Sequence, residues 1–179
     1  MSDSGQIIGL DLSLTSTGVA VYDEDTDCIT TDVIKTCNKH TDTERYYTIL
    51  HRISNYVISK NVFFIEGYSF GSFSKSSSMS KLIELGGIIK YDLWLKGVPY
   101  IKVPPTTLKK FITGKGNAKK EDIKLAVYKK YGREFKTSDE ADAFSLVVLG
   151  IKYCKTPSNK FKGLTQLEES CLEKIKGEE

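Results

Sequence analysis

Residues 9–23 read GLDLSLTSTGVAVYD, and this stretch decides the fold. Apolar residues before and after a Ser/Thr/Gly turn predict two strands of a hairpin near the middle of a sheet. Asp11 lies in the first strand, where a carboxylate is uncommon and its burial is costly unless a positive charge compensates it. The stretch therefore raises the question of whether Asp11 binds a cation, and whether other acids lie near it.

The remaining chain predicts an α/β protein whose five-stranded sheet has mixed strand directions and is flanked by helices on both faces. Strands are expected at 6–12, 17–23, 28–36, 61–68 and 98–103. Helices are expected at 42–60, 78–96, 105–112, 121–132 and 137–154, with a weaker one at 164–176. Residues 1–155 are predicted to form one domain, and residues 156–179 a C-terminal tail with a possible short helix.

Composition limits the function classes. No apolar run approaches the ~20 residues of a membrane span, and the first residues lack a signal peptide pattern, so we expect a cytoplasmic protein that does not contact a membrane. Four widely spaced cysteines and two histidines argue against a zinc site and favour free thiols in a reducing compartment. If the chain is encoded by a virus or phage, that compartment is the host cytoplasm.

The charge distribution is uneven. The formal net charge is only +3, but residues 102–133 contain ten Lys and Arg against the two acids Glu121 and Asp122. Residues 1–60 contain nine acids against five basic residues. A basic segment of this size favours a polyanionic partner, although a solvated helix face and loop would also account for it.

Three further acids lie in unusual settings. Glu66 follows the apolar residues 62–65 at the end of a predicted buried strand. Asp139 and Asp142 lie three residues apart, on one face of the first turn of a helix. Taken singly, Glu66 is explained by a buried salt bridge, and acids in a first helical turn complement the helix dipole.

Taken together, these acids indicate a metal site. If the two strands are neighbours and the helix packs on their sheet, several carboxylates meet at one point and repel each other. Mg²⁺ ions relieve such repulsion because they prefer oxygen ligands, and two divalent cations ~3.5–4 Å apart are the arrangement used for in-line phosphoryl transfer. Acids beside a basic segment therefore predict a nuclease.

In order and spacing, these features resemble RuvC-type Holliday-junction resolvases of the ribonuclease H-like superfamily, including virus- and phage-encoded members. The resemblance rests on GLDLSLTSTG, FFIEGY, the DEAD sequence that opens a helix, and the basic segment TLKKFITGKGNAKKEDI at 107–123. It covers residues 6–153. It implies a ribonuclease H-like fold and an endonuclease that cuts four-way DNA junctions in paired nicks, leaving 5′-phosphate and 3′-hydroxyl ends.

The resemblance also implies roles for particular residues. Asp11, Glu66, Asp139 and Asp142 would bind two Mg²⁺ per site, with Mn²⁺ as a substitute, and Lys120 would assist catalysis. The expected DNA-binding residues are Lys109, Lys110, Lys115, Lys119, Lys120, Phe70 and Phe73. An aromatic residue that disturbs base pairs is also implied, but the spacing does not select among Tyr68, Phe70 and Phe73. The family acts as a homodimer, and we expect the helix around 78–96, with its Gly86-Gly87 pair, to form the contact.

Other functions stay open at this point. A nuclease of the same fold that cuts flaps, other branched DNA or RNA–DNA hybrid is one, and a junction-binding module without catalysis is another. An ATP-binding kinase with a similar phosphate hairpin would need two domains, for which 179 residues leave no room.

Overall fold

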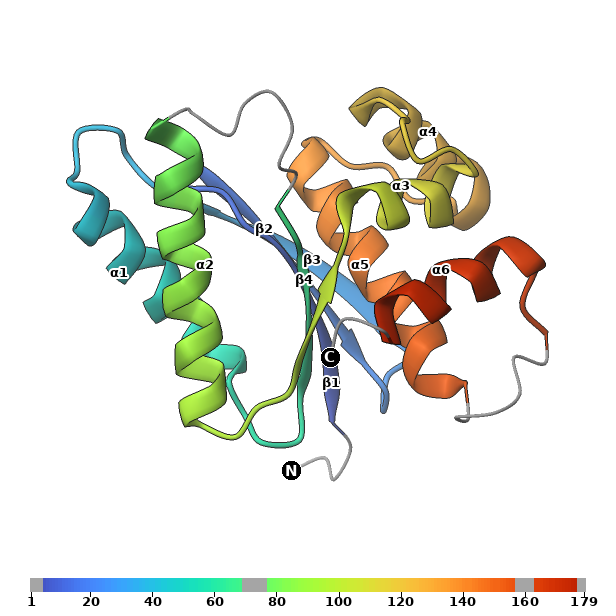
Figure 1. Ribbon diagram of the computed structural model, residues 1–179, viewed down its shortest axis with the longest axis horizontal. Helices are drawn as coiled ribbons and strands as arrows, with labels where there is room; N and C mark the ends of the chain where they lie inside the picture. The colour runs from blue at the N-terminus through green and yellow to red at the C-terminus, as the bar shows by residue number, and fades with distance from the viewer. Residues whose placement is uncertain (1–4, 69–76, 157–162, 177–179) are drawn as a thin grey trace.

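The structure, a computed structural model, describes residues 5–68, 77–156 and 163–176 and contains a mixed five-stranded sheet between two layers of helices (Figure 1). The strands are β1 (Gln6–Asp11), β2 (Ser16–Asp23), β3 (Cys28–Lys35), β4 (Val62–Glu66) and β5 (Tyr100–Val103). The helices are α1 (Asp42–Ile53), α2 (Ser77–Leu95), α3 (Pro105–Thr113), α4 (Lys120–Tyr131), α5 (Ser138–Lys155) and α6 (Gln166–Lys176), with a 3₁₀ turn at Ser54–Tyr56. The predicted architecture is confirmed.

The strand order β3-β2-β1-β4-β5 places β1 at the centre of the sheet. β1, β2 and β3 are consecutive antiparallel strands, as expected for hairpins, whereas β1, β4 and β5 run parallel. Parallel strands require crossover connections, which α1 and α2 provide. The C-terminal ends of β1, β4 and β5 therefore lie along one edge of the sheet.

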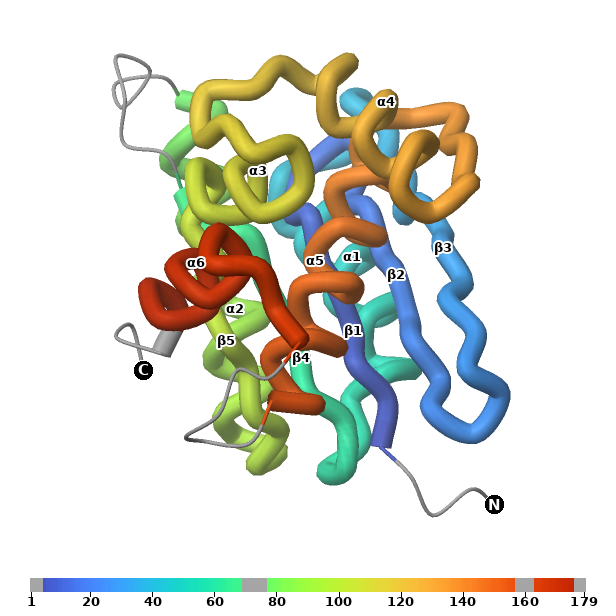
Figure 2. The backbone as a smooth tube through the Cα atoms, turned by 90° about the vertical axis from the view of Figure 1, so that its right-hand side faces the viewer, coloured from blue at the N-terminus to red at the C-terminus, as the bar shows by residue number. Residues whose placement is uncertain are grey.

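Alternating side chains of the strands build two cores. On one face, residues such as Ile8, Leu10 and Phe63 pack under α1 and α2. On the other, Ile7 and Phe64 pack under α3, α4, α5 and α6. Figure 2 shows α5 lying along β1 and β2 on this second face. Because side chains alternate along a strand, Asp11 and Glu66 belong to the face that α5 covers.

Helix α5 lies unusually close to the sheet because glycines face it. A β-carbon on Gly9 would collide with the backbone carbonyl oxygen of Ala143, and one on Gly18 with the carbonyl of Asp139. Gly150 of α5 similarly lies against Phe64. The glycines thus fix the position of the helix that carries Asp139 and Asp142.

The predicted helix over 42–60 is too long, because α1 ends at residue 53 and a 3₁₀ turn follows it. α1 ends at Ile53, where Ser54 caps it, although Tyr56 and Val57 continue to pack against the core. The side-chain amide of Asn61 donates to the carbonyl of Tyr56 at 2.9 Å and stabilises this non-helical path. The apolar spacing therefore predicted correctly that Tyr56 and Val57 contact the core, although they lie beyond the end of the helix.

α6 packs against α3 and buries Cys171, Leu172 and Ile175 in the core under α5. Cys171 is a free thiol, as are the exposed Cys28, Cys37 and Cys154. Of the helices in the described ranges, none has the length and apolar character needed to cross a membrane. The division of the chain at residue 155 stays a prediction. Residues of α6 share a core with α3 and α5.

Candidate active site

Asp11 and Glu66 lie side by side at the edge of the sheet. Leu10 pairs with Ile65 in the parallel ladder. Asp11 and Glu66 follow these two residues directly, so they end β1 and β4 next to each other. The two carboxyl groups hydrogen-bond to one another, and both side chains are half-buried. The sequence prediction that these two acids belong to neighbouring strands is confirmed.

Helix α5 brings the other two acids to the same place. Thr137 caps it in a capping box, in which the Glu140 carboxylate accepts from the Thr137 backbone N–H at 3.0 Å and Thr137 Oγ1 accepts from the Glu140 N–H at 3.2 Å. Glu140 is therefore occupied with the helix start. Asp139 and Asp142 instead face the sheet edge, and Asp142 is buried, with 7% of its surface exposed.

The protonation of the cluster reflects its burial. Burial raises the pKa of Asp11 well above its ordinary value, and the neighbouring charges of Glu66 and Asp139 raise it further. Burial likewise raises the pKa of Glu66, and burial with the Asp11 charge raises that of Asp142 to about 7. Joint ionisation of Asp11, Glu66 and Asp142 is therefore unfavourable here without added positive charge.

Two lysines of the basic segment supply part of that charge. The positive charges of Lys120 at the start of α4 and Lys109 in α3 lower the pKa values of Glu66 and Asp142, opposing burial. Lys120 Nζ also lies 3.5 Å from Ser138 Oγ, beside the first turn of α5. The structure thus brings both lysines to the carboxylate cluster.

The other predicted DNA-binding residues lie elsewhere. Lys110 lies beside α6, where burial raises the pKa of the Cys171 thiol and the positive charge of Lys110 opposes this larger effect. Lys115 and Lys119 are exposed in the loop between α3 and α4. Phe70 and Phe73 lie outside the described residues. Tyr68 packs inward, with its hydroxyl against Gly86 of α2, which explains one of the two helix glycines.

Ser16 is a site residue that the sequence did not indicate. Its Oγ donates to a carboxylate oxygen of Asp139 at 2.5 Å and so orients an acid that lies 123 positions away in the chain. The contact exists because Gly18, two residues later, lets α5 approach the hairpin. No local pattern in the turn distinguishes this serine from its neighbours.

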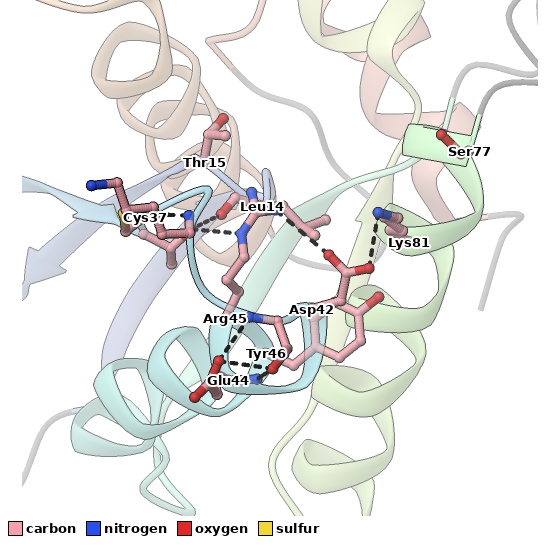
Figure 3. Close-up of polar contacts among 12 residues, drawn as sticks. Leu14, Thr15, Cys37, Asp42, Glu44, Arg45, Tyr46, Ser77 and Lys81 are labelled. Atoms are coloured by element: carbon pink, nitrogen blue, oxygen red, sulfur yellow. Dashed lines mark hydrogen bonds and ion pairs between the residues drawn. The ribbon is translucent and has the colours of Figure 1, made fainter.

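The turn between β1 and β2 is also held from the opposite layer (Figure 3). Arg45 Nε donates to Thr36 Oγ1 at 3.0 Å, and that hydroxyl donates to the carbonyl of Leu14. Asp42 then bridges Arg45 at 3.6 Å and Lys81 at 2.9 Å. The start of α1 therefore ties the turn to the N-terminal half of α2.

The donor set fits divalent cations in its chemistry, since it consists of carboxylate oxygens whose repulsion a cation would relieve. In the part of the chain that the structure describes, however, no three acidic, histidine or cysteine side chains already surround one metal position. Asp11 and Glu66 instead lie against each other at the ends of neighbouring strands.

The raised pKa of Asp142 predicts a pH-dependent stability. Its folded value of about 7 exceeds the ordinary 3.8, so the metal-free fold loses stability as pH rises from about 4 to about 7. Each pH unit corresponds to about 1.4 kcal/mol, so the expected loss is a few kcal/mol. In EDTA, Asp142→Asn should raise the unfolding temperature more at pH 8 than at pH 5. Glu140→Gln on the same helix should show no such gain, and an equal effect of Asp142→Asn at both pH values would contradict the assignment.

The strand order, with acids at the ends of β1 and β4 and α5 across one face, defines a protein of ribonuclease H-like fold. Residues 7–149 match the family of crossover junction endodeoxyribonuclease RuvC, and the chain belongs to this family.

Relatives and solved structures agree with this assignment. The chain is 27% identical over 150 residues to crossover junction endodeoxyribonuclease RuvC of Prochlorococcus marinus, covering 79% of this chain and 92% of the relative. It is 32% identical over 149 residues to that of Ehrlichia canis, covering 79% and 93%. Thermus thermophilus RuvC in complex with Holliday junction substrate is a structural neighbour with a TM-score of 0.61 and 19% identity, over 80% of this chain and 90% of that one.

Proposed function

We propose that this protein is a structure-specific DNA endonuclease that resolves four-way Holliday junctions by hydrolysing phosphodiester bonds in paired nicks. The observation that carries the proposal is the meeting of Asp11, Glu66, Asp139 and Asp142 at one edge of the sheet, in a member of the RuvC family. The names of the relatives, all crossover junction endodeoxyribonucleases, support the reaction class.

In this proposal the four carboxylates hold two Mg²⁺ ions, for which Mn²⁺ can substitute. When bound, the ions supply a nucleophile at neutral pH and neutralise charge that develops on the phosphate. Ser16 orients Asp139 by its hydrogen bond, and the short strand ends fix Asp11 and Glu66. The Lys120 ammonium group, beside the acids, offsets negative charge on the phosphate during bond breakage. The expected products carry 5′-phosphate and 3′-hydroxyl ends.

The basic segment guides the DNA backbone to this edge. Lys109 and Lys120 lie at the acids, and the exposed Lys115 and Lys119 extend positive charge along the loop between α3 and α4. Neutralising phosphates with lysines makes binding weaken as salt concentration rises. Action in the cytoplasm, or in the host cytoplasm for a virus- or phage-encoded protein, is part of the proposal and agrees with four free thiols.

A second copy of the chain completes the proposal, because two nicks need two sites. The outer face of α2 exposes large apolar side chains: Ile83, Ile88, Tyr91, Trp94 and Leu95. The rings of Tyr91 and Trp94 stack with centroids 6.1 Å apart, and a β-carbon on Gly87 would meet no atom within 4 Å. A contiguous apolar face of this kind favours a protein contact, and Gly87 would let a partner helix approach closely.

The dimer gives a prediction with a matched control. Trp94→Lys should convert the dimer into a monomer, because it replaces the most exposed apolar side chain of this face with a charge. Trp94 and Tyr47 are equally exposed, at 69% and 68%, but Tyr47 lies on α1, so Tyr47→Lys should leave the dimer intact. Light scattering during gel filtration measures both masses. A dimeric Trp94→Lys protein would place the contact elsewhere.

A panel of end-labelled substrates tests the function. Wild-type protein with Mg²⁺ or Mn²⁺ is incubated with a four-way junction, a linear duplex, a flap and an RNA–DNA hybrid. We expect paired symmetric nicks in the junction and little cutting of the others. Equal cutting of flaps would indicate a general debranching nuclease, cutting of the hybrid alone a different substrate on the same fold, and tight junction binding without cutting a binding module.

A further inference from the structure

A concave site on the α2 face of the sheet carries positive charge that the proposed mechanism does not use. A cavity of about 400 Å³ lies where β4 and β5 end, and its lining includes Tyr68, Lys90 of α2, Lys102 of β5 and Glu66. Ile101 and Val103 point into the core under α5, so Lys102 between them points to the α2 side. The segment 66–68 thus separates this cavity from the carboxylate cluster, which lies on the α5 side.

Lys90 is held in this cavity by packing. Its ammonium nitrogen lies 5.1 Å from the centroid of the Tyr68 ring, in a cation–π arrangement, and the side chain is half-buried. Tyr68 in turn is fixed against Gly86, one turn earlier in α2. Burial lowers the pKa of Lys90, and the charge of Lys102 lowers it further. Two ammonium groups therefore face one hollow and repel each other.

Among the described residues, neither Lys90 nor Lys102 forms an ion pair with an acid. Other lysines near α2 have acidic partners there: Lys81 pairs with Asp42 at 2.9 Å, and Lys96 with Asp92 at 2.7 Å. Glu66 borders the cavity, but its carboxyl group bonds to Asp11 on the other side. A pair of lysines that share a concave site without a counter-ion is the arrangement expected of an anion site.

We infer that Lys90 and Lys102 form a second phosphate-binding site, which takes a backbone phosphate of the bound DNA next to the phosphate that is cut. This inference rests on the proposed function. Because Glu66 contributes to both sites, a strand that crosses the sheet edge would present one phosphate to the carboxylates and a neighbouring one to the lysines. The two contacts together would fix the position of the scissile bond along the strand, which a single metal site cannot do.

The proposed role of the two positive charges is tested with Lys90→Gln, Lys102→Gln and the double variant. Lys96→Gln, one residue beyond the end of α2, is the control. Binding of a fluorescent four-way junction is followed by anisotropy over a NaCl series. Each phosphate contact contributes about 0.9 to the slope of log affinity against log salt, so the double variant should flatten the slope by about one. We expect each single variant to bind about three- to tenfold more weakly and Lys96→Gln to match wild type. Unchanged affinity and slope in the double variant would overturn the inference.

A second measurement identifies the phosphate. Junctions with one neutral methylphosphonate at successive positions around the cut are compared for wild type and the double variant. One neighbouring position should weaken binding of wild type and have no effect on the double variant. The same profile for both proteins would exclude a DNA contact. Saturation of the Lys90 and Lys102 ammonium signals in NMR spectra by inorganic phosphate alone, with that same profile, would assign the site to free phosphate.

These outcomes separate the two proposals. If wild-type protein shows no preference for the junction over linear duplex, the proposed function fails. In that case the salt series and the methylphosphonate scan are repeated with linear duplex. A phosphate contact that wild type makes and the double variant lacks would still support the phosphate site. Thermal unfolding of each variant confirms the fold, and removal of one of two repelling charges should leave it unchanged or slightly more stable.

Discussion

Asp11→Asn is expected to lower the rate of junction cleavage by on the order of 10³-fold or more, because it removes a charged ligand from the proposed metal site. Junction binding should be retained or become tighter, since a negative charge near phosphate is lost. In EDTA the variant should also unfold at a higher temperature, because Asp11 is half-buried beside Glu66 and Asp139 and its ionisation is unfavourable.

The matched control is Asp32→Asn. Asp32 is an exposed acid of β3 that pairs with Arg52 of α1 at 2.9 Å, on the face of the sheet opposite α5 and two strands from β1. Cleavage and binding by this variant should equal those of wild type. Single-turnover cleavage and anisotropy measure the two properties separately. If Asp11→Asn lost binding and cleavage together, Asp11 would have a structural role instead.

Gly9→Ala should destabilise the protein by about 3 kcal/mol, the upper part of the usual range for overpacking. The added methyl group would collide with the Ala143 carbonyl oxygen and lie 3.0 Å from Leu146 Cβ. Both atoms belong to α5, and backbone cannot rotate away as a side chain can. Because α5 carries Asp139 and Asp142, cleavage should fall with stability.

Gly87→Ala adds the same methyl group but is expected to increase stability. Gly87 is exposed in α2 with open space around it, so alanine should stabilise the helix by up to ~1 kcal/mol. Both variants are compared by urea unfolding in the Trp94→Lys background, which is expected to be monomeric, so that the proposed dimer does not contribute. If Gly9→Ala were as stable as its parent, α5 would not lie as close to the sheet as the structure shows.

The fold and the four acids could be predicted because they leave local signals. Asp11 and Glu66 interrupt apolar strands, and Asp139 and Asp142 share a helix face, so each position is unusual before any contact is known. Their convergence required only the common topology of parallel strands joined by helices. The strand pairing then confirmed what the pattern implied.

Contacts between distant segments could not be predicted in the same way. The bond from Ser16 to Asp139 depends on the approach of α5 to Gly18, which the sequence does not encode in either segment alone. The lysines of the basic segment also do not lie together. Lys109 and Lys120 lie at the acids, Lys110 lies beside α6, and Lys115 and Lys119 lie in the loop between α3 and α4. Lys102 lies on the opposite face of the sheet.

The carboxylate edge is proposed to hydrolyse junction DNA with divalent cations. The most direct measurement follows single-turnover cleavage of an end-labelled four-way junction in EDTA and in increasing Mg²⁺, and then treats the products with DNA ligase. We predict no cutting in EDTA, and with Mg²⁺ two opposite nicks that ligase seals, because each carries a 5′-phosphate and a 3′-hydroxyl. Cutting that persists in EDTA, or nicks that ligase cannot seal, would contradict the account.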